Sequence, residues 1–344
     1  MWHIGGIDLE GRVVLGPMSG VTSVGYRRFM EPFGVATSVT EMTSDAGVIH
    51  IGDRYNPFVE FESDVPTGLQ LFGCNPDMMA EGASKALRMN PSIAYIDVNM
   101  GCPVAKIVRN GAGSALMRVP ERCAEIVRSI RSKAEVPVTA KIRLGWSMAS
   151  VNFETVIESL TEAGADAVAL HVRTKEEQYY GHPHYELAEG LQKRMSVPLI
   201  ISGNIDSLGD ARDALRITGA DAVMIARGGV GNPFLVTQID RYLRTGDILP
   251  NPTVAQQIDW CLELTDMIIE EKGEEQGMRR MRMFAPKFIA GCCGCREYRR
   301  DLALNIRDRD SMVRMLSDIR ERMGQLTINS QLNKKMEKVP FGTC

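Results

Sequence analysis

The amino-acid sequence predicts a (β/α)₈ TIM barrel followed by a smaller all-α helical domain. Eight short runs of apolar residues recur along the first 246 residues, with helix-like segments between them. The runs are continuously apolar, which is typical of strands in a parallel sheet that is buried on both faces. After Gly246 only helical patterns remain. We therefore expect a barrel over residues 1–246 and a helical domain over residues 247–344.

The expected strands are rich in β-branched residues, which favour extended backbone. They lie at Val13–Leu15, Thr37–Thr40, Gly68–Phe72, Ala94–Val98, Val138–Ile142, Ala167–Val172, Pro198–Ile201 and Ala222–Ile225. Eight strand–helix units within roughly 230 residues match the size of a closed barrel. A doubly wound open sheet is the alternative fold, but the glycine fingerprint that usually follows the first strand of such a sheet is missing.

The helices between these strands are predicted from signals at their ends. Asn75-Pro76-Asp77 is a typical helix start, and the pattern continues to Met89; Pro120 opens another helix. Residues 152–163 and 207–218 are each followed by a glycine, the residue that most often ends a helix. Both then lead through Gly-Ala-Asp into the next expected strand, as a (β/α) unit requires.

Composition and charge exclude several classes of protein. The 344 residues are 44% hydrophobic and 24% charged, with a net charge of −3, which is typical of a soluble globular protein and gives no global attraction to nucleic acid. The eight cysteines are scattered and no secretion signal is evident, so we expect cytosolic free thiols. No apolar stretch approaches the roughly 20 residues that cross a bilayer. We expect a cytoplasmic protein with no membrane association and no obligate protein partner.

In a barrel, the active site lies where the strands end, because the loops that follow the strands build it. Polar or charged residues stand at these positions: Glu41, Gln70, Asn99, Lys141, Arg143, His171, Arg173, Asn204 and Arg227. One such residue alone is better explained by helix capping or by a salt bridge. Because they recur at equivalent positions, we expect them to line one site.

The loop after the fourth expected strand carries Cys102 between a glycine and a proline, on stiff backbone with little bulk beside the thiol. Lys106 follows closely and favours an anionic ligand. Taken alone, the loop supports two interpretations equally: a thiol presented to a substrate, or a small buried hydrophobe.

Two glycine-containing loops follow the last two expected strands, Ser202-Gly203-Asn204 and Ala226-Arg227-Gly228-Gly229. Loops at these positions in TIM barrels commonly bind phosphate through backbone N–H groups. Arg227 would add a planar, permanent cation. We expect a phosphate site here rather than simple turns.

The predicted helical domain begins after the proline-containing stretch at residues 248–252, with an amphipathic helix over Val254–Glu271. Residues 279–322 hold twelve Lys/Arg and six Asp/Glu, although the whole chain is slightly acidic. We expect a surface for a phosphate backbone rather than an ordinary solvated helix face. The cluster Cys292, Cys293 and Cys295 lacks the paired ligands of a structural zinc site, so we expect packing at a close helix contact and no metal.

Several segments together resemble the tRNA-dihydrouridine synthases. The resemblance is close over residues 12–245 and looser over the helical tail. It rests on GPMSGVT at Gly16, Glu41-Met42, GLQLFG around Gln70, DVNMGCPVAKIVRNGAGSAL around Cys102, TAKIRLGW, HVRT with YYGHPHY, and ARGGVGNPF.

This resemblance implies an FMN-dependent barrel with a C-terminal helical domain that binds tRNA. Members of the family reduce the C5–C6 double bond of particular uridines, with NADPH, or alternatively NADH, as the reductant. By the same resemblance, Cys102 donates a proton to C5 while reduced FMN delivers hydride to C6.

The resemblance also assigns residues to the cofactor and to the substrate. The FMN positions are Gly16, Pro17, Met18, Gln70, Lys141 and His171, with Ser202, Gly203, Asn204, Ala226 and Arg227 at its phosphate. The substrate positions are Asn99, Lys106 and Arg173 in the barrel and Arg279, Arg280 and Arg282 in the helical domain.

Three other functions remain compatible with parts of the pattern. A flavin oxidoreductase of the dihydroorotate-dehydrogenase type accounts for the barrel residues but not for the basic tail. A phosphate-binding aldolase would use Lys141 as a Schiff base. A non-catalytic RNA-binding protein gives no reason for the row of polar residues at the strand ends.

Overall fold

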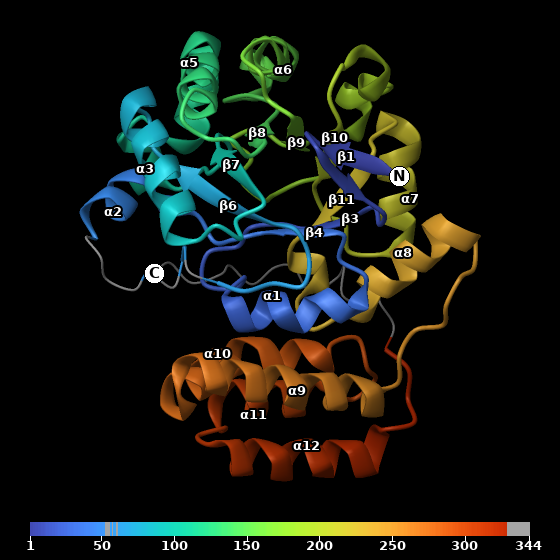
Figure 1. Ribbon diagram of the computed structural model, residues 1–344. Coiled ribbons are helices and arrows are strands. Elements are labelled where there is room, and N and C mark those ends of the chain that lie inside the picture. The colour runs from blue at the N-terminus through green and yellow to red at the C-terminus, as the bar shows by residue number, and fades with distance from the viewer. Residues whose placement is uncertain (52–55, 57, 60, 329–344) are drawn as a thin grey trace.

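The computed structural model describes residues 1–51, 56, 58–59 and 61–328 (Figure 1). Eight parallel strands form a ring in the order β4-β3-β11-β10-β9-β8-β7-β6, and β4 pairs with β6 to close it. The ring strands are β3 (Val13–Leu15), β4 (Thr37–Val39), β6 (Thr67–Phe72), β7 (Tyr95–Asn99), β8 (Val138–Arg143), β9 (Ala167–His171), β10 (Leu199–Ser202) and β11 (Ala222–Ile225). A short strand, β5 (Thr43–Ser44), extends the pairing of β6. The TIM barrel is therefore confirmed.

Each of the eight expected strands is present, displaced by at most one residue at either end. The strand residues of β3, β7, β9, β10 and β11 are all buried. Burial on both faces explains why their apolar runs do not alternate with polar residues.

A β-hairpin at the N-terminus was not expected from the sequence. Its strands β1 (Trp2–Ile4) and β2 (Ile7–Leu9) pair antiparallel, and the indole N–H of Trp2 donates to the Gly11 carbonyl at 2.7 Å. Trp2, Ile4 and Leu9 are buried in one cluster with side chains from the barrel strands. The turn at Gly5 abuts Pro137, which precedes β8, so the hairpin closes the amino end of the barrel. Each of its strands contains an exposed polar residue, His3 or Asp8, so neither gives the continuous apolar run by which the barrel strands were predicted.

Helices surround the barrel (Figure 1). They are α1 (Val24–Met30), α2 (Asp45–His50), α3 (Pro76–Met89), α4 (Ala105–Arg109), α5 (Pro120–Arg131), α6 (Phe153–Glu162), α7 (Leu208–Thr218) and α8 (Phe234–Thr245). The end signals act as expected: Asn75 caps α3 by accepting from the Met78 N–H at 3.0 Å, and Gly219 ends α7 in the left-handed conformation.

The C-terminal helices are α9 (Val254–Lys272), α10 (Glu274–Phe288), α11 (Arg296–Leu304) and α12 (Arg309–Met323). In Figure 1, α1 lies between the barrel and helices α9 and α10, and α12 forms the outer layer. Aromatic contacts join the two parts: Tyr26 stacks on Phe284 with ring centroids 5.5 Å apart, and Trp260 stacks on Phe234 at 5.5 Å. Such pairs add about 0.5–1.5 kcal/mol each beyond the area they bury.

Candidate functional site

Strand register brings the predicted polar residues together at the carboxyl end of the barrel. Asn99 on β7 pairs with Lys141 on β8, and on the other side of β8 Arg143 pairs with His171. His171 pairs in turn with Ser202 on β10. Residues far apart in the sequence thus share neighbouring positions at one edge, as the barrel prediction requires.

A chain of side-chain hydrogen bonds runs through this edge. Thr139 donates to one Asp97 carboxylate oxygen at 2.6 Å, and the Gln70 amide donates to the other at 2.6 Å. The Asn99 amide donates to the Gln70 carbonyl oxygen at 2.8 Å. Burial raises the pKa of Asp97, and the bonds from Gln70 and Thr139 offset part of that effect. In both Gln70 and Asn99 the side-chain NH2 group donates one hydrogen bond and the side-chain oxygen accepts another, so each amide is fixed in one orientation.

The Cys102 loop is held by the residue at the end of this chain. The side-chain oxygen of Asn99 accepts a hydrogen bond from the backbone N–H of Cys102 at 2.9 Å and another from that of Gly101 at 3.2 Å. On the far side, the Ser114 hydroxyl donates to the Cys102 carbonyl at 2.9 Å. The thiol is half-buried and forms no disulfide with another cysteine of the described chain. A loop fixed at both faces presents its side chain in a reproducible direction.

Arg143, which the sequence placed at a strand end without assigning it a role, has three main-chain partners. It donates to the Gly101 carbonyl at 2.7 Å, the Thr174 carbonyl at 2.9 Å and the Gln178 carbonyl at 2.7 Å. Its side chain is 2% exposed, so these bonds replace its hydration. Arg143 therefore joins the Cys102 loop to the loop after β9. In the sequence, only its positive charge and its position at a strand end pointed to this role.

Electrostatics favour a neutral imidazole and a protonated thiol at this edge. Burial, and then the charges of Arg143, Lys141, Arg173 and Arg227, lower the pKa of His171 well below 6.5. Burial, and then the charge of Arg143, lower the pKa of Lys141 to about 8. Burial raises the pKa of Cys102 above its ordinary value of 9.0. The site thus holds a thiol proton at neutral pH beside a tunable cation.

The loop after β9 crosses the site. Buried Arg173 donates to the carbonyls of Tyr180 at 2.9 Å and Gly181 at 2.6 Å, and to the Asn204 side chain at 3.2 Å. Tyr179 is 51% exposed, and the guanidinium carbons of Arg143 and Arg227 each lie 5.3 Å from its ring centre. Arg173 thus supports the loop that carries this aromatic ring.

The two expected phosphate loops lie against each other. A Cβ on Gly228 would stand 2.1 Å from the Ile205 carbonyl, so only glycine allows this approach. Gly203 and Asn204 have φ values of +134° and +50°. Among the described residues, no acceptor is found for the backbone N–H groups of Gly203, Asn204, Arg227 and Gly228. Ser202 is the last residue of β10, and Ala226 directly follows β11.

The loop between β3 and α1 forms another wall of the site and contains Gly16, Pro17 and Met18. The Gly16 N–H donates to the Ile225 carbonyl at 2.8 Å, directly before the Ala226 loop. Three hydrogen bonds join Met18 and Thr22: the Met18 N–H donates to the Thr22 hydroxyl at 2.9 Å, and the Thr22 N–H and hydroxyl donate to the Met18 carbonyl at 3.0 and 3.2 Å. This wall is therefore one compact turn next to the phosphate loops.

The predicted substrate cations differ in their surroundings. Lys106 on α4 is exposed. Arg279 is exposed and pairs with Glu275 at 2.6 Å. Arg280 donates to the Gly20 carbonyl, and Arg282 donates to the Ile306 carbonyl at 2.9 Å. Two of the three helical arginines thus have main-chain partners inside the protein.

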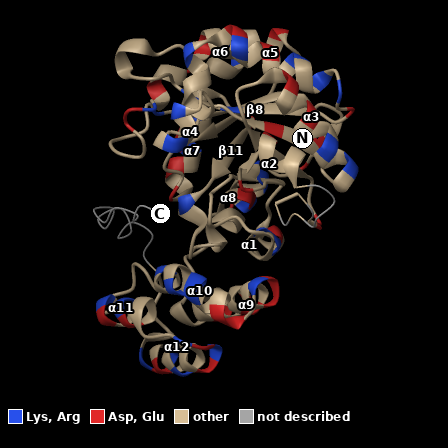
Figure 2. Ribbon diagram, turned by 90° about the vertical axis from the view of Figure 1, so that its left-hand side faces the viewer, with Lys and Arg blue, Asp and Glu red and all other residues tan. Residues whose placement is uncertain are grey.

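Acidic residues accompany the basic residues of α9 to α12 (Figure 2). Arg309 pairs with Asp266 at 2.5 Å, and Arg320 pairs with Asp259. Both carboxylates belong to α9, outside the span in which the sequence shows a basic excess. The excess is therefore smaller on the folded surface than along the chain.

Cys292 and Cys295 are buried and Cys293 is exposed. Within the described part of the chain, no group of three or more His, Cys, Asp or Glu side chains is arranged to hold a metal ion. Nor is any helix among the described residues long and apolar enough to cross a membrane.

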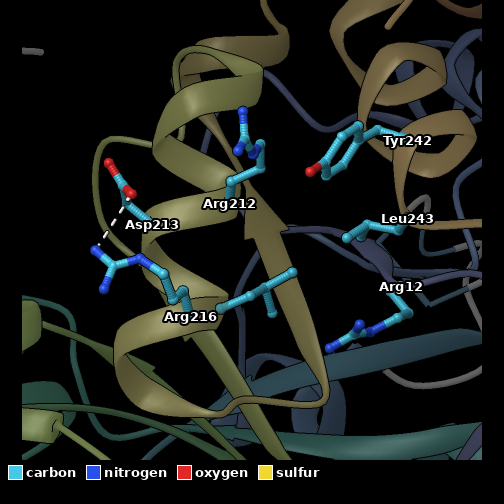
Figure 3. Close-up of a pocket in the computed structure, with 7 residues that line it drawn as sticks. Arg12, Arg212, Asp213, Arg216, Tyr242 and Leu243 are labelled. Carbon is cyan, nitrogen blue, oxygen red and sulfur yellow. Dashed lines mark hydrogen bonds and ion pairs between the residues drawn. The ribbon is translucent and has the colours of Figure 1, made fainter. Parts of the chain in front are cut away.

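A cavity of about 240 Å³ lies elsewhere, between α7 and α8 (Figure 3). Its three arginines already have partners: Arg12 donates to the Ala220 and Asp221 carbonyls, Arg212 lies over Tyr242, and Arg216 pairs with Asp213. None of the predicted site residues lines this cavity.

Comparison with known proteins agrees with this geometry. The family model "Dihydrouridine synthase (Dus)" matches residues 14–323. The chain is 37% identical over 273 residues to "Probable tRNA-dihydrouridine synthase 1" of Synechocystis sp., covering 79% of this chain and 76% of that protein. It is 36% identical over 298 residues to "tRNA-dihydrouridine synthase B" of Pseudomonas aeruginosa, covering 86% and 89%.

Among solved structures, a chimera of (S)-mandelate dehydrogenase is 17% identical and covers 71% of this chain and 76% of its own, with a TM-score of 0.46, a similarity too weak to bear on function. The family match, by contrast, spans both the barrel and the helical domain. The chain belongs to the dihydrouridine synthase (Dus) family.

Proposed function

We propose that the chain is a tRNA-dihydrouridine synthase, an FMN-dependent oxidoreductase of the cytoplasm that reduces the C5–C6 double bond of uridines in tRNA with NADPH, or NADH, as reductant. The observation that carries the proposal is the Cys102 loop, which Asn99 and Arg143 hold at the carboxyl end of the barrel. Relatives named tRNA-dihydrouridine synthases cover most of the chain and support the substrate class.

The residues present fit FMN. The four N–H groups that have no acceptor among the described residues, with the Arg227 guanidinium, form a site for a phosphate group. The Lys141 ammonium also has no hydrogen-bond acceptor in the described part of the chain, although it is half-buried. We assign Gln70, Lys141 and His171 to the polar edge of the ring, Gly16-Pro17-Met18 to its side, and Ser202–Asn204 with Ala226-Arg227 to its phosphate.

When bound, FMN supplies hydride chemistry that no side chain can supply. The protein contributes geometry and charge. Lys141 provides a cation where a reduced ring would be negative, and its lowered pKa makes that charge sensitive to the surroundings. Neutral His171 donates or accepts a hydrogen bond without adding a further charge.

Cys102 is the proposed general acid. Its raised pKa keeps the proton on Sγ at neutral pH, and the thiol gives that proton to C5 of the uracil. Asn99 and Arg143 orient the loop, which lowers the entropic cost of bringing the thiol to the carbon. We assign Asn99 to the uracil base and Arg173 to the nucleotide, where Arg173 also supports the loop after β9.

We assign Lys106 and Arg279 to phosphates of the tRNA, because both side chains are exposed. Arg282 retains N–H groups beyond the one bonded to Ile306, and it would strengthen the same surface. Each lost phosphate contact should weaken binding and reduce its salt dependence by about one unit of slope.

The direct test uses tRNA from a strain that lacks dihydrouridine synthases. The purified protein, FMN and NADPH are incubated with it, and dihydrouridine is measured by nucleoside mass spectrometry. A gain that is lost in Cys102→Ala supports both the reaction and the acid. A flavin-bound protein that oxidises NADPH without forming dihydrouridine, or that accepts free orotate, would refute the tRNA assignment.

A further inference from the structure

The loop at residues 16–23 is held from outside the barrel. We propose that Glu271 and Arg280 of the helical domain are positioning residues, which fix this loop and thereby the wall of the site formed by Gly16, Pro17 and Met18. The inference rests on the proposed function for its catalytic consequence, but not for its structural one.

Glu271 caps helix α1 from a different part of the chain. One carboxylate oxygen accepts the Ser23 hydroxyl at 2.7 Å and the Gly25 N–H at 2.9 Å. The first turn of α1 contains no acidic residue, and Ser23 makes no capping bond to its own helix. The first N–H groups of a helix need acceptors, and a carboxylate also complements the helix dipole. Glu271 supplies the acceptor and the negative charge, so it fixes the point at which the loop ends and α1 begins.

The carboxylate is itself well oriented. Lys272 donates to its second oxygen at 2.9 Å. Burial raises the pKa of Glu271, but the bonds from Lys272, Ser23 and Gly25 outweigh it and hold the pKa below 4.5. Glu271 is therefore ionised at neutral pH and accepts at both oxygens.

Arg280 fixes the middle of the same loop. Its guanidinium donates to the Gly20 carbonyl, while the N–H of Gly20 donates to Glu41 of the barrel at 2.7 Å. Gly20 has a φ of +73°, a conformation that favours glycine. The two domains thus hold the two polar groups of a single residue.

The loop transmits this constraint to the site. Val21 and Thr22 both donate to the Met18 carbonyl, at 2.9 and 3.0 Å. Arg27, which is buried, donates to the Thr22 carbonyl at 2.8 Å. With so many internal bonds the turn moves as a unit, so a shift at Gly20 or Ser23 displaces Met18. Small displacements in an active site cost large factors in rate, up to about 100-fold for 1 Å.

Neighbouring arginines offer a matched comparison. Arg279 is exposed, and its one bonded partner among the described residues is Glu275, whereas Arg280 is half-buried against Gly20. Arg280→Ala should therefore loosen the loop, while Arg279→Ala should act on the tRNA alone. The sequence assigned both residues to the substrate.

The experiment compares the full-length chain with Arg280→Ala, Glu271→Ala, Glu271→Gln and Arg279→Ala. Hydrogen exchange of residues 16–23 is measured without cofactor or RNA, followed by FMN affinity, kcat and KM for tRNA. We expect at least about tenfold faster loop exchange and about tenfold lower kcat in Arg280→Ala and Glu271→Ala, with KM unchanged within about twofold. Glu271→Gln keeps an acceptor and should recover part of the loss. Arg279→Ala should raise KM and leave the loop exchange unchanged.

Wild-type loop exchange in Arg280→Ala and Glu271→Gln would overturn the inference, even if Glu271→Ala failed to fold. A raised KM with normal kcat in Arg280→Ala would assign Arg280 to the RNA and overturn it as well. Faster loop exchange in a protein that forms no dihydrouridine would support the positioning role and refute only the proposed function.

Discussion

The side-chain oxygen of Asn99 lies 2.9 Å from the backbone nitrogen of Cys102 and accepts its hydrogen bond. The amide nitrogen of the same side chain donates to Gln70, which in turn donates to Asp97 inside the barrel. The position of the thiol is thus fixed by the rigid strands and not by its loop alone. This arrangement leads to the first prediction.

Asn99→Ala should lower kcat by about 100-fold, because the Cys102 loop loses its anchor. FMN affinity should change much less, since Asn99 contacts neither of the two proposed phosphate loops and Gln70 keeps its bond to Asp97. Dihydrouridine formation and flavin fluorescence measure the two effects. Asn75→Ala is the control: it removes the cap of α3, costs about 1 kcal/mol of stability and should not alter kcat. Equal losses in both variants would assign Asn99 a purely structural role.

Cys102→Ala should abolish dihydrouridine formation while NADPH still reduces the bound flavin, because only the proton donor is removed. Stopped-flow absorbance follows flavin reduction, and mass spectrometry follows the product. Cys74→Ala removes an exposed thiol and should retain full activity. If Cys102→Ala turned over normally, another acid would have to be found.

Arg143→Met should lower the free energy of unfolding by about 3 kcal/mol, because three main-chain carbonyls lose the donor that a buried charged side chain supplies. Arg143→Lys keeps the charge but not the planar fork, so it should recover only part of the loss. Urea titration gives the values. Arg128→Ala on the exposed face of α5 should change stability by less than about 0.5 kcal/mol.

The loop after β9 should be more stable in mild acid than in mild alkali. His184 contacts Glu177 at 2.6 Å and Glu186 at 3.1 Å, and the bond to Glu177 raises the pKa of His184 above 6.5. A raised histidine pKa gives stability that is complete below 6.5 and is lost as the pH rises through the folded-state pKa. The pKa of Glu177 is lowered, because bonds from Thr174 and His184 outweigh burial, so its contribution is lost only in stronger acid.

Hydrogen exchange of residues 174–185, corrected for intrinsic rates, should therefore be faster at about pH 8.5 than at about pH 6. His184→Ala should remove this difference, and His182→Ala, at an exposed position two residues away, should keep it. A pH-independent wild-type loop would contradict the role of this pair.

The sequence was sufficient to locate the eight barrel strands, because burial on both faces leaves continuous apolar runs. It also located the strand ends, and parallel strands bring their ends to one edge, so a site there followed from the fold class alone. The N-terminal hairpin was missed because His3 and Asp8, both exposed, interrupt its two short strands and leave no continuous apolar run. In each case the prediction depended on the residue pattern within a single segment of the sequence.

Only the tertiary structure determined which polar groups pair across long distances in the sequence. Ser23 meets Glu271 across 248 positions, and Gly20 meets Arg280 across 260. Similarly, Asp259 and Asp266 neutralise arginines that looked unopposed in the sequence. An arginine that binds RNA and one that bonds to a carbonyl are the same letter in the sequence. Only the packing of the helical domain against α1 determines which groups lie within hydrogen-bonding distance.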